Sequence, residues 1–308
     1  DSADVNKFIE KYKSYWPELS IPGIENSIEV SEQQIRQITE KYLLAVQQAA
    51  RIYRKIENVK GGDNFIAEVS MDETDLPQTP VELFFILAMI AEYEIPAQTI
   101  APKFSGRFNK GVDYAGDLDA FEKESNQDLA VIAFAVNEFS LPENLKMSIH
   151  SGSDKFSIYP SINKALKKYG AGLHVKTACT TWLEEIAGLA LAGEQPLEFA
   201  KQIYSKAYQQ FDQLCKPYAT VIDINKDNLP TPQAVQQYSS EQFAYAIKHD
   251  PDNPLYNPDI RQLLHVAYKI AADDFQTYSK LIQKYEFIVS KHVTENIYEN
   301  HVKPIFIA

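Results

Sequence analysis

Short apolar runs alternate with longer segments of helical apolar spacing through the middle of the chain. Apolar runs that are bounded by Gly, Pro or charged residues are typical of strands. We predict strands at Asn64–Met71, Ala97–Ala101, Lys146–His150 and Leu173–Thr177. Helical spacing predicts helices at Val81–Tyr93, about Leu118–Phe139, Pro160–Tyr169 and Thr181–Ala192. This alternation is the pattern of βα units with a parallel sheet.

The segments on either side of this region are mainly helical. We predict a helix over Asp1–Trp16 and a longer one that follows Ser31 and runs to about Lys60, because Ser-Glu-Gln-Gln resembles a capping box. Later helices are predicted at Pro196–Cys215, Ser239–Lys248 and Tyr278–Ile297. Two further segments are ambiguous: Ala219–Ile224 as a strand, and Leu263–Tyr268 as a strand or a helix start.

The number of predicted strands limits the fold class. Four strands and two ambiguous ones are fewer than the eight of a closed parallel barrel. We therefore expect an α/β fold in which either the sheet is open or part of a barrel is absent from this chain. Asp250–Pro258, with three prolines, is expected to be a loop and a candidate lid.

Composition and charge exclude several classes of function. A net charge of −12 argues against a nucleic-acid partner, which needs clustered Lys and Arg. No apolar run reaches the roughly 18 residues that span a membrane, and the apolar stretch Leu83–Ala91 fits a buried helix. The two cysteines, Cys179 and Cys215, form no disulfide framework and are expected to be buried thiols. We therefore expect a cytoplasmic protein with a small-molecule partner.

Ionisable side chains follow each predicted strand, where reacting groups of parallel α/β folds gather. They are Asp72, Glu73 and Asp75 after the first strand, Lys103 after the second, His150, Asp154 and Lys155 after the third, and Lys176 in the fourth. Period-two alternation places Glu68, Ser70 and Asp72 on one strand face. A carboxylate in an apolar strand requires a partner, so Glu68 either pairs with a lysine or takes part in a site.

Two histidines on consecutive predicted strands, His150 and His174, are candidate metal ligands. Two imidazoles and a carboxylate are a usual set for a catalytic divalent metal. The alternative is two histidines that form hydrogen bonds within the protein or to the substrate. His174 is placed early in its predicted strand, which weakens this assignment. His265 lies with them at the carboxyl ends of the strands only if its segment is a strand. The remaining histidines, His249, His292 and His301, are expected to be solvated.

The loop after His150 contains Ser151, Gly152, Ser153, Asp154 and Lys155. It resembles an anion cradle of small residues, although it is shorter than a phosphate-binding glycine loop. Serine and lysine side chains suit the hydroxyl and carboxylate groups of a sugar acid. The sequence contains no P-loop, dinucleotide fingerprint or GxSxG motif.

Several exact strings resemble the tagaturonate/fructuronate epimerase family of hexuronate catabolism. They are AEVSMDET, PQTPVELFFI, APKFSGRFNKGVDYAGDL, SIHSGSDKFSIYP, HVKTACTTWLE and RQLLHVAYK. The resemblance covers about Asp63–Tyr285 in order. It implies a metal-dependent epimerase that interconverts D-tagaturonate and D-fructuronate, a (β/α) TIM-type barrel with extra C-terminal helices, and a divalent cation such as Zn, Mn, Ni or Fe.

The resemblance also implies roles for individual residues. The acid/base candidates are Glu68, Asp72 and Asp154, and the metal-ligand candidates are His150, His174 and His265. The candidates that bind the substrate are Lys103, Ser151, Ser153, Lys155, Lys176 and Arg261. Family members are expected to be longer at the N-terminus, so residues 1–308 are expected to be one catalytic domain that lacks the first barrel strands. A homo-oligomer or a separate N-terminal segment is expected to complete it.

The epimerised carbon is β to the substrate ketone, so simple enolisation does not make its proton acidic. Retro-aldol cleavage followed by re-addition is the expected route, since no nicotinamide fingerprint supports transient oxidation. Two alternatives remain at this point. One is a related metal-dependent sugar isomerase or class II aldolase, and the other is a non-catalytic paralogue that binds sugar acids.

Overall fold

The computed structural model describes residues 2–307, and the side chain of Asp63 is outside this description. The chain divides into two compact units, each built from three segments. The first comprises Asp1–Ser105, Asp117–His150 and Lys164–Val175. The second comprises Gly106–Gly116, Ser151–Asn163 and Lys176–Ala308. That residues 1–308 form a single domain stays a prediction.

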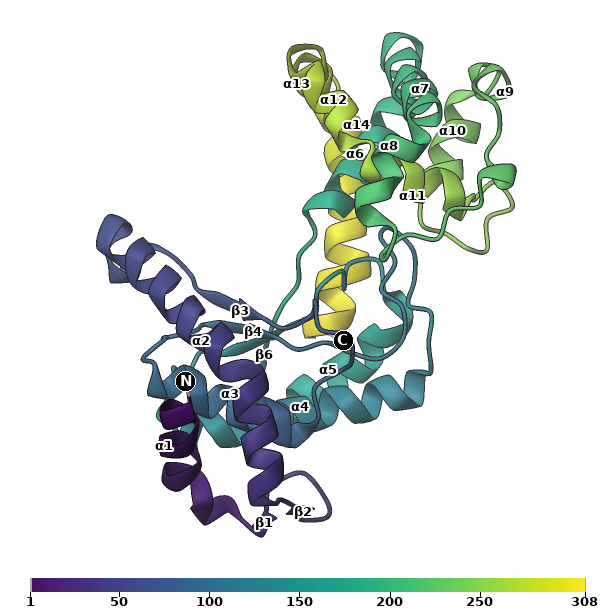
Figure 1. Cartoon of the computed structure of the whole chain (residues 1–308). Coiled ribbons are helices and arrows are strands. Elements are labelled where there is room, and N and C mark those ends of the chain that lie inside the picture. Colours follow the sequence, from purple (N-terminus) through teal and green to yellow (C-terminus); the bar gives the residue numbers. More distant parts are fainter. Residues whose placement is uncertain (1, 308) are drawn as a thin grey trace. The chain divides into compact units, whose positions relative to one another are not determined.

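A parallel four-stranded sheet lies in the first unit (Figure 1). Its strands, in spatial order, are β3 (Glu68–Ser70), β4 (Thr99–Ala101), β5 (Lys146–Ser148) and β6 (Gly172–His174). The register aligns Val69 with Ile100, Ile100 with Met147, and Met147 with Leu173. The four predicted strands and the parallel α/β sheet are therefore confirmed. Each strand is shorter than predicted and spans three residues.

Helices α2 (Glu32–Lys60), α3 (Pro80–Glu92) and α4 (Leu118–Glu138) accompany the sheet (Figure 1). The Ser31 hydroxyl accepts a hydrogen bond from the Gln34 amide and begins α2, and Gly61 ends it with a φ of 83°. A capping box between Thr79 and Glu82 begins α3. Since α3 is apolar on all sides and buried, it forms the centre of this unit's core.

The remaining elements of the first unit are small. The predicted N-terminal helix is α1 (Ser2–Tyr12), followed by a 3₁₀ turn at Lys13–Tyr15, and its predicted first residue, Asp1, lies outside the described residues. Two short strands, β1 (Glu18–Leu19) and β2 (Ile28–Glu29), form their own antiparallel pair. Helix α5 (Tyr159–Tyr169) contributes residues to both units.

The second unit is helical. Its helices are α6 (Ala178–Leu191), α7 (Glu194–Gln209), α8 (Phe211–Cys215), α9 (Pro232–Gln236), α10 (Ser240–Ile247), α11 (Pro258–Val266), α12 (Tyr268–Asp273), α13 (Phe275–Lys284) and α14 (Glu286–Thr294). A π-helical segment follows at Glu295–Ile307. The buried Trp182 of α6 packs against the rings of Tyr268 and Tyr278 and donates a hydrogen bond to the Leu264 carbonyl at 2.9 Å. This aromatic cluster ties α6 to the later helices.

Four predictions about the second unit require correction. Ala219–Ile224 is not a strand, because the Val221 amide bonds to the Tyr218 carbonyl in a turn. Leu263–Tyr268 is helical and contains the break between α11 and α12. The predicted helix Tyr278–Ile297 is interrupted where Tyr285 leaves helical geometry, and Pro196–Cys215 forms two helices. The predicted loop over residues 250–257 is confirmed.

Two predictions from composition are tested by the described residues. Within residues 2–307, every helix is too short or too polar to cross a bilayer. Cys215 is buried as expected, whereas Cys179 is exposed because it lies in the solvent-facing first turn of α6. The cytoplasmic location stays a prediction.

Gly188 provides a test of the packing of α6 on α14. A Cβ atom at this position would lie 2.9 Å from the Val289 Cα, so the two helices pack closely only around glycine. Gly188→Ala is expected to lower the free energy of unfolding by about 1–3 kcal/mol through overpacking. In an open helix the same change stabilises by ~1 kcal/mol. Urea unfolding measures the difference.

Gly62→Ala is the matched control for this test. Its added Cβ would meet only the flexible end of the Glu57 side chain, at 3.3 Å. The control is therefore expected to be at least as stable as the wild type. A Gly188→Ala protein as stable as the wild type would show that α6 and α14 do not pack as described.

Candidate functional site

Two carboxylates and two imidazoles of the first unit lie within hydrogen-bond distance of one another. His150 Nδ1 is 2.5 Å from Asp72 Oδ2, and His150 Nε2 is 2.8 Å from Glu68 Oε1. The second Glu68 oxygen, Oε2, is 3.3 Å from His174 Nδ1. Glu68 therefore connects the two histidines, and we call these four residues the carboxylate–histidine cluster.

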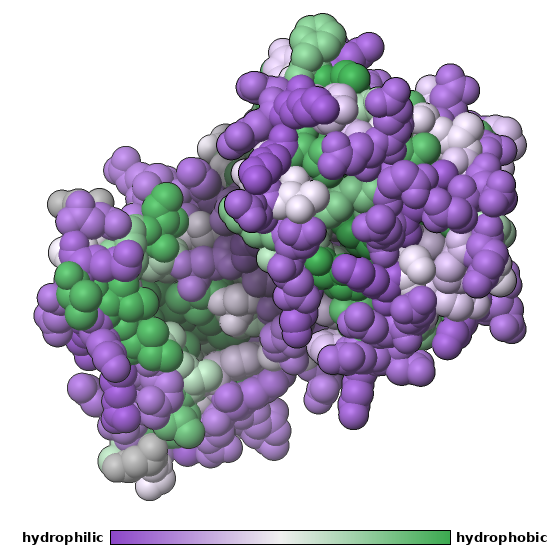
Figure 2. Space-filling view, turned by 90° about the horizontal axis from the view of Figure 1, so that it is seen from above, coloured by the Kyte–Doolittle hydropathy of each residue, from purple (hydrophilic) through white to green (hydrophobic). Residues whose placement is uncertain are grey.

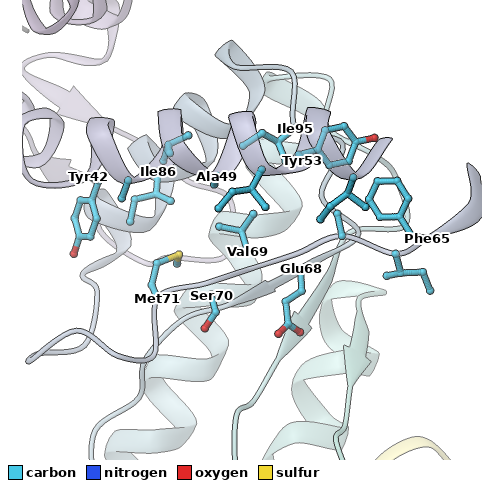
Figure 3. A pocket seen from close by; sticks show the side chains of 16 residues that line it. Tyr42, Ala49, Tyr53, Phe65, Glu68, Val69, Ser70, Met71, Ile86 and Ile95 are labelled. Atoms are coloured by element: carbon cyan, nitrogen blue, oxygen red, sulfur yellow. The ribbon is translucent and has the colours of Figure 1, made fainter. Parts of the chain in front are cut away.

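Strand geometry explains why these four side chains meet. Figure 3 shows that Glu68 and Ser70 point to one face of β3, whereas Val69 points to the opposite face, toward α2. His150 lies two residues beyond the end of β5, and His174 is the last residue of β6. The expectation that His174 lies early in its strand is therefore wrong. Parallel pairing brings the carboxyl ends of these strands to one edge of the sheet.

The cluster is partly open to solvent. The side chains of Glu68, Asp72 and His150 are 21%, 24% and 24% exposed, and that of His174 is 43% exposed. Both ring nitrogens of His150 contact carboxylate oxygens, whereas a neutral imidazole has only one N–H to donate. Both His150 nitrogens are thus engaged by carboxylates. The partial exposure of the four side chains lets a small polar molecule reach them.

Two further side chains of the first unit hold Asp72 in place. The Ser70 hydroxyl donates to Asp72 Oδ1 at 2.5 Å. The Lys103 ammonium donates to the Asp72 carbonyl at 3.4 Å and to the Thr74 carbonyl. Lys103 was predicted from the sequence, but Ser70 was not assigned to the site. Its spacing of two residues from both Glu68 and Asp72 is the signal that identifies it.

Other predicted site residues lie in a buried charge cluster of the second unit. Arg261 Nη2 is 2.9 Å from Asp154 Oδ2, and Arg261 Nη1 is 3.3 Å from Glu184 Oε1. Arg261 also donates to the carbonyls of Gly111, at 2.5 Å, and Ile247. All three charged side chains are at most 1% exposed. We call Asp154, Glu184, Arg261, His249 and His301 the buried charge cluster.

His249 and His301 are buried, although the sequence predicts that they are solvated. His249 Nδ1 and His301 Nε2 each lie 3.8 Å from Asp154 Oδ1, and both side chains are 2% exposed. The expectation that both are solvated is wrong, because each packs against the ring of Phe156. His292 is half-buried.

Burial shifts the pKa of these groups in different directions. Burial alone raises the pKa of the Asp154 carboxyl, but the Arg261 guanidinium and the two histidines outweigh it and hold that pKa well below its usual range. Burial raises the pKa of Glu184 to about 7, against the opposing effect of Arg261. Burial likewise lowers the pKa of Lys155 to about 8 and that of His265 to about 3. Asp154 and Arg261 therefore form a stable ion pair.

Backbone carbonyl groups surround the Lys155 ammonium. Its ammonium donates to the carbonyls of Asn109 at 2.8 Å, Val112 at 2.6 Å and Ser153 at 3.1 Å. Ser153 itself is buried, Ser151 is half-buried and Lys176 is exposed. The predicted roles of these residues in catalysis and binding stay untested. The contacts of Asp154, Lys155, Arg261 and the buried His265 favour structural roles for those four.

A family model of tagaturonate epimerases matches residues 2–306. The chain belongs to the tagaturonate epimerase family. This membership confirms the resemblance that the strings around Glu68, His150 and His174 indicate. A characterised relative, the tagaturonate/fructuronate epimerase of Thermotoga maritima, is 29% identical over 279 residues. The match covers 88% of this chain and 52% of the relative, so the chain spans about half the length of that family member.

Solved structures show the same fold. The native crystal structure of a fructuronate-tagaturonate epimerase from Cohnella laeviribosi superposes with a TM-score of 0.75 at 23% identity. The superposed region covers 99% of this chain and 60% of the Cohnella laeviribosi protein. A structure of the same enzyme with two glycerol molecules gives a TM-score of 0.73 at 22% identity. The arrangement of the sheet and helices is thus shared with members of the tagaturonate epimerase family.

The metal that the family resemblance implies can be compared with the donor groups present. Two imidazoles and two carboxylates are suitable donors for a divalent cation. Within residues 2–307, however, no three or more His, Cys, Asp or Glu side chains are arranged around a common point for an ion. In the carboxylate–histidine cluster the donors contact one another instead. The donor types fit a metal, but their placement does not form a preorganised cage.

The raised pKa of Glu184 predicts a dependence of stability on pH. Its ordinary value is 4.5 and its value in the folded protein is about 7, so folding favours the protonated carboxyl. The associated stability is fully present below pH 4.5 and is lost as the pH rises through 7. Relative to Glu184→Gln, the wild type is expected to lose roughly 3 kcal/mol over this range.

Urea unfolding at several pH values measures this difference. Glu241→Gln, a change at an exposed position of α10, serves as the control and is expected to show no such trend. If the difference between the wild type and Glu184→Gln stays constant with pH, the raised pKa of Glu184 is refuted.

Proposed function

We propose that the chain carries catalytic groups of an enzyme that interconverts D-tagaturonate and D-fructuronate. The observation that carries this proposal is the position of Glu68, which bridges His150 and His174 at the carboxyl ends of parallel strands. Family membership supports the substrate class. The partial exposure of the cluster gives a small sugar acid access to it.

The proposal includes a (β/α) barrel as the complete fold. Four parallel strands in sequential spatial order, with helices between them, are what consecutive units of such a barrel contain. In a barrel, reacting groups gather at the carboxyl ends of the strands, which is where Asp72, His150 and His174 lie.

The proposed reaction is retro-aldol cleavage followed by re-addition. Glu68 removes the proton from the hydroxyl of the epimerised carbon. The bond from that carbon to the carbon next to the ketone breaks, and its electron pair moves into the ketone, which leaves an aldehyde and an enolate. The aldehyde rotates, the enolate carbon attacks its opposite face, and Glu68 returns the proton to the new hydroxyl oxygen. This series of steps needs no oxidant.

The other residues of the cluster hold these groups in position. Asp72 contacts His150 and fixes its ring, which in turn contacts Glu68. Among Lys103, Lys155 and Arg261, Lys103 is the residue that we propose to bind the uronate carboxylate. Its ammonium lies beside Asp72, whereas the Lys155 ammonium and the Arg261 guanidinium are buried in contacts within the second unit.

We also propose, from the family resemblance, that His150 and His174 bind a divalent cation. Bound there, a cation such as Zn, Mn, Ni or Fe would supply Lewis-acid stabilisation of negative charge. The donor types of the cluster support this part of the proposal, and no step of the reaction above is derived from it.

Conversion of tagaturonate to fructuronate, followed by chromatography, tests the reaction. Glu68→Gln keeps the side-chain shape but cannot accept the proton, so it is expected to lower kcat by about 10²-fold or more. Glu73→Gln, at an exposed neighbouring position, is the control and is expected to leave kcat unchanged. Net release of three-carbon products would instead identify an aldolase, and full activity of Glu68→Gln would refute its role.

Metal analysis of purified protein tests the proposed cation without an activity assay. His150→Ala removes an imidazole that contacts both carboxylates, so bound divalent metal is expected to be lost. His292→Ala is the control, since this half-buried histidine lies on α14 in the second unit. Stoichiometric metal in His150→Ala would exclude the proposed ligand set.

A further inference from the structure

The π-helical segment Glu295–Ile307 packs against the part of the second unit that follows β5. Hydrophilic side chains cover most of the face of this unit that Figure 2 shows. His301, by contrast, is 2% exposed. Its ring lies against the rings of Phe156 and Tyr159, with a centroid distance of 5.5 Å in each pair. The π-helical segment therefore buries an imidazole among aromatic rings of the chain that follows β5.

Two backbone groups determine which nitrogen of His301 carries hydrogen. The Asp154 amide donates a hydrogen bond to His301 Nε2 at 3.0 Å, and His301 Nδ1 lies 2.9 Å from the Asn296 carbonyl oxygen. Since the amide can only donate and the carbonyl can only accept, Nε2 carries no hydrogen and Nδ1 carries one. Burial favours this neutral form, because it lowers the pKa of His301 below its ordinary value of 6.5, against the opposing effect of the Asp154 carboxylate. His301 is therefore a neutral hydrogen-bond acceptor for the Asp154 amide.

The Asp154 amide belongs to a loop whose backbone has an uncommon conformation. Ser151 and Asp154 have φ angles of 52° and 60°, in the left-handed region that residues with a side chain rarely adopt. Such residues keep this conformation only when the surrounding structure holds them. The Tyr159 hydroxyl donates to the Gly152 carbonyl at 2.9 Å, and His301 accepts from the Asp154 amide. These two bonds hold the backbone of the loop near both of its left-handed residues.

This loop begins at the residue after His150. Residues 151–155 are continuous along the backbone with His150, whose ring contacts Glu68 and Asp72 in the carboxylate–histidine cluster. The conformation of Ser151 sets the direction in which the backbone leaves His150. A displacement of about 1 Å in a reacting group can lower a rate by about 10²-fold. Loss of order in the loop would therefore reach the proposed catalytic groups through the chain itself.

We propose that His301 is a positioning residue for the proposed reaction. Its Nε2 anchors the Asp154 amide, fixes the loop over residues 151–155, and so holds the backbone from which the His150 ring projects. The role is indirect, because His301 acts on the loop backbone and not on the substrate. The effect on turnover rests on the proposed function, whereas the anchor itself is measurable without catalysis.

Nitrogen NMR of the histidine rings tests the anchor directly in the wild-type chain. The signal that is absent from the spectrum of His301→Gln identifies His301. At neutral pH this ring is expected to carry hydrogen on Nδ1 and none on Nε2. Hydrogen on Nε2, or on both nitrogens, would overturn the proposal, because the Asp154 amide would then have no acceptor on His301.

A pair of substitutions separates the acceptor from the ring. His301→Gln keeps an acceptor for the Asp154 amide in its side-chain oxygen, whereas His301→Phe keeps a ring against Phe156 and Tyr159 but has no acceptor. Hydrogen exchange of the Asp154 amide is expected to accelerate about tenfold or more in His301→Phe and to stay within about twofold of the wild type in His301→Gln. Tyr298→Phe changes an exposed residue of the same segment and is the control, with no expected change in exchange.

Kinetics of the epimerase reaction test the consequence for turnover. His301→Phe is expected to lower kcat about tenfold or more with little change in KM, because the defect lies in the placement of His150 beside the proposed base. His301→Gln is expected to restore most of this loss, and Tyr298→Phe is expected to keep the wild-type kcat. Urea unfolding of each variant separates a loss of turnover from a loss of stability.

The outcomes distinguish this inference from the proposed function. A wild-type chain without epimerase activity contradicts the proposed function and with it the effect on turnover, and the NMR and exchange measurements then decide the anchor. Wild-type kcat in a folded His301→Phe, or equal losses of kcat in His301→Gln and His301→Phe, would overturn the positioning role. Equal exchange of the Asp154 amide in the wild type and in His301→Phe would overturn the anchor.

Discussion

Parallel backbone pairing of four three-residue strands determines where the polar side chains of the first unit meet. The register that aligns Ser148 with His174 places the ends of β5 and β6 side by side. Glu68 is the first residue of β3, and its long side chain reaches His150 and His174 at the ends of the neighbouring strands. None of the contacts in the carboxylate–histidine cluster is local, since His150 is separated from Asp72 by 78 residues and from Glu68 by 82. The cluster is therefore a product of the sheet.

The two polar clusters of the chain differ in what surrounds them. The carboxylate–histidine cluster is partly exposed, and its groups contact one another without being enclosed. The buried charge cluster is closed to solvent. Arg261 donates hydrogen bonds to the carboxyl groups of Asp154 and Glu184 and to two backbone carbonyls. A buried ion pair costs desolvation energy that only such complete bonding offsets. The first arrangement suits exchange with a ligand, and the second suits a fixed core.

Much of the first unit could be predicted from sequence, because strand and helix signals there are local. Apolar runs located all four strands, and period-two alternation placed Glu68 and Ser70 on one face. The second unit was harder. His249 and His301 lie in polar sequence, and their burial depends on Asp154, Arg261 and Phe156, which are distant in the chain. Likewise, the sequence does not reveal that Arg261 and Lys155 contact buried protein groups, because sequence spacing carries no information about such distances.

The ion pair between Asp154 and Arg261 joins residues 107 positions apart, one in the loop after β5 and the other on α11. Because the second unit is assembled from three separate segments, its short N-terminal pieces gain their contacts only after the long helical segment has been made. Closing a loop of this length has an entropic cost that local helix formation does not repay, which slows folding. The loop that contains Asp154 and Lys155 therefore owes its order to helices that are distant in the sequence.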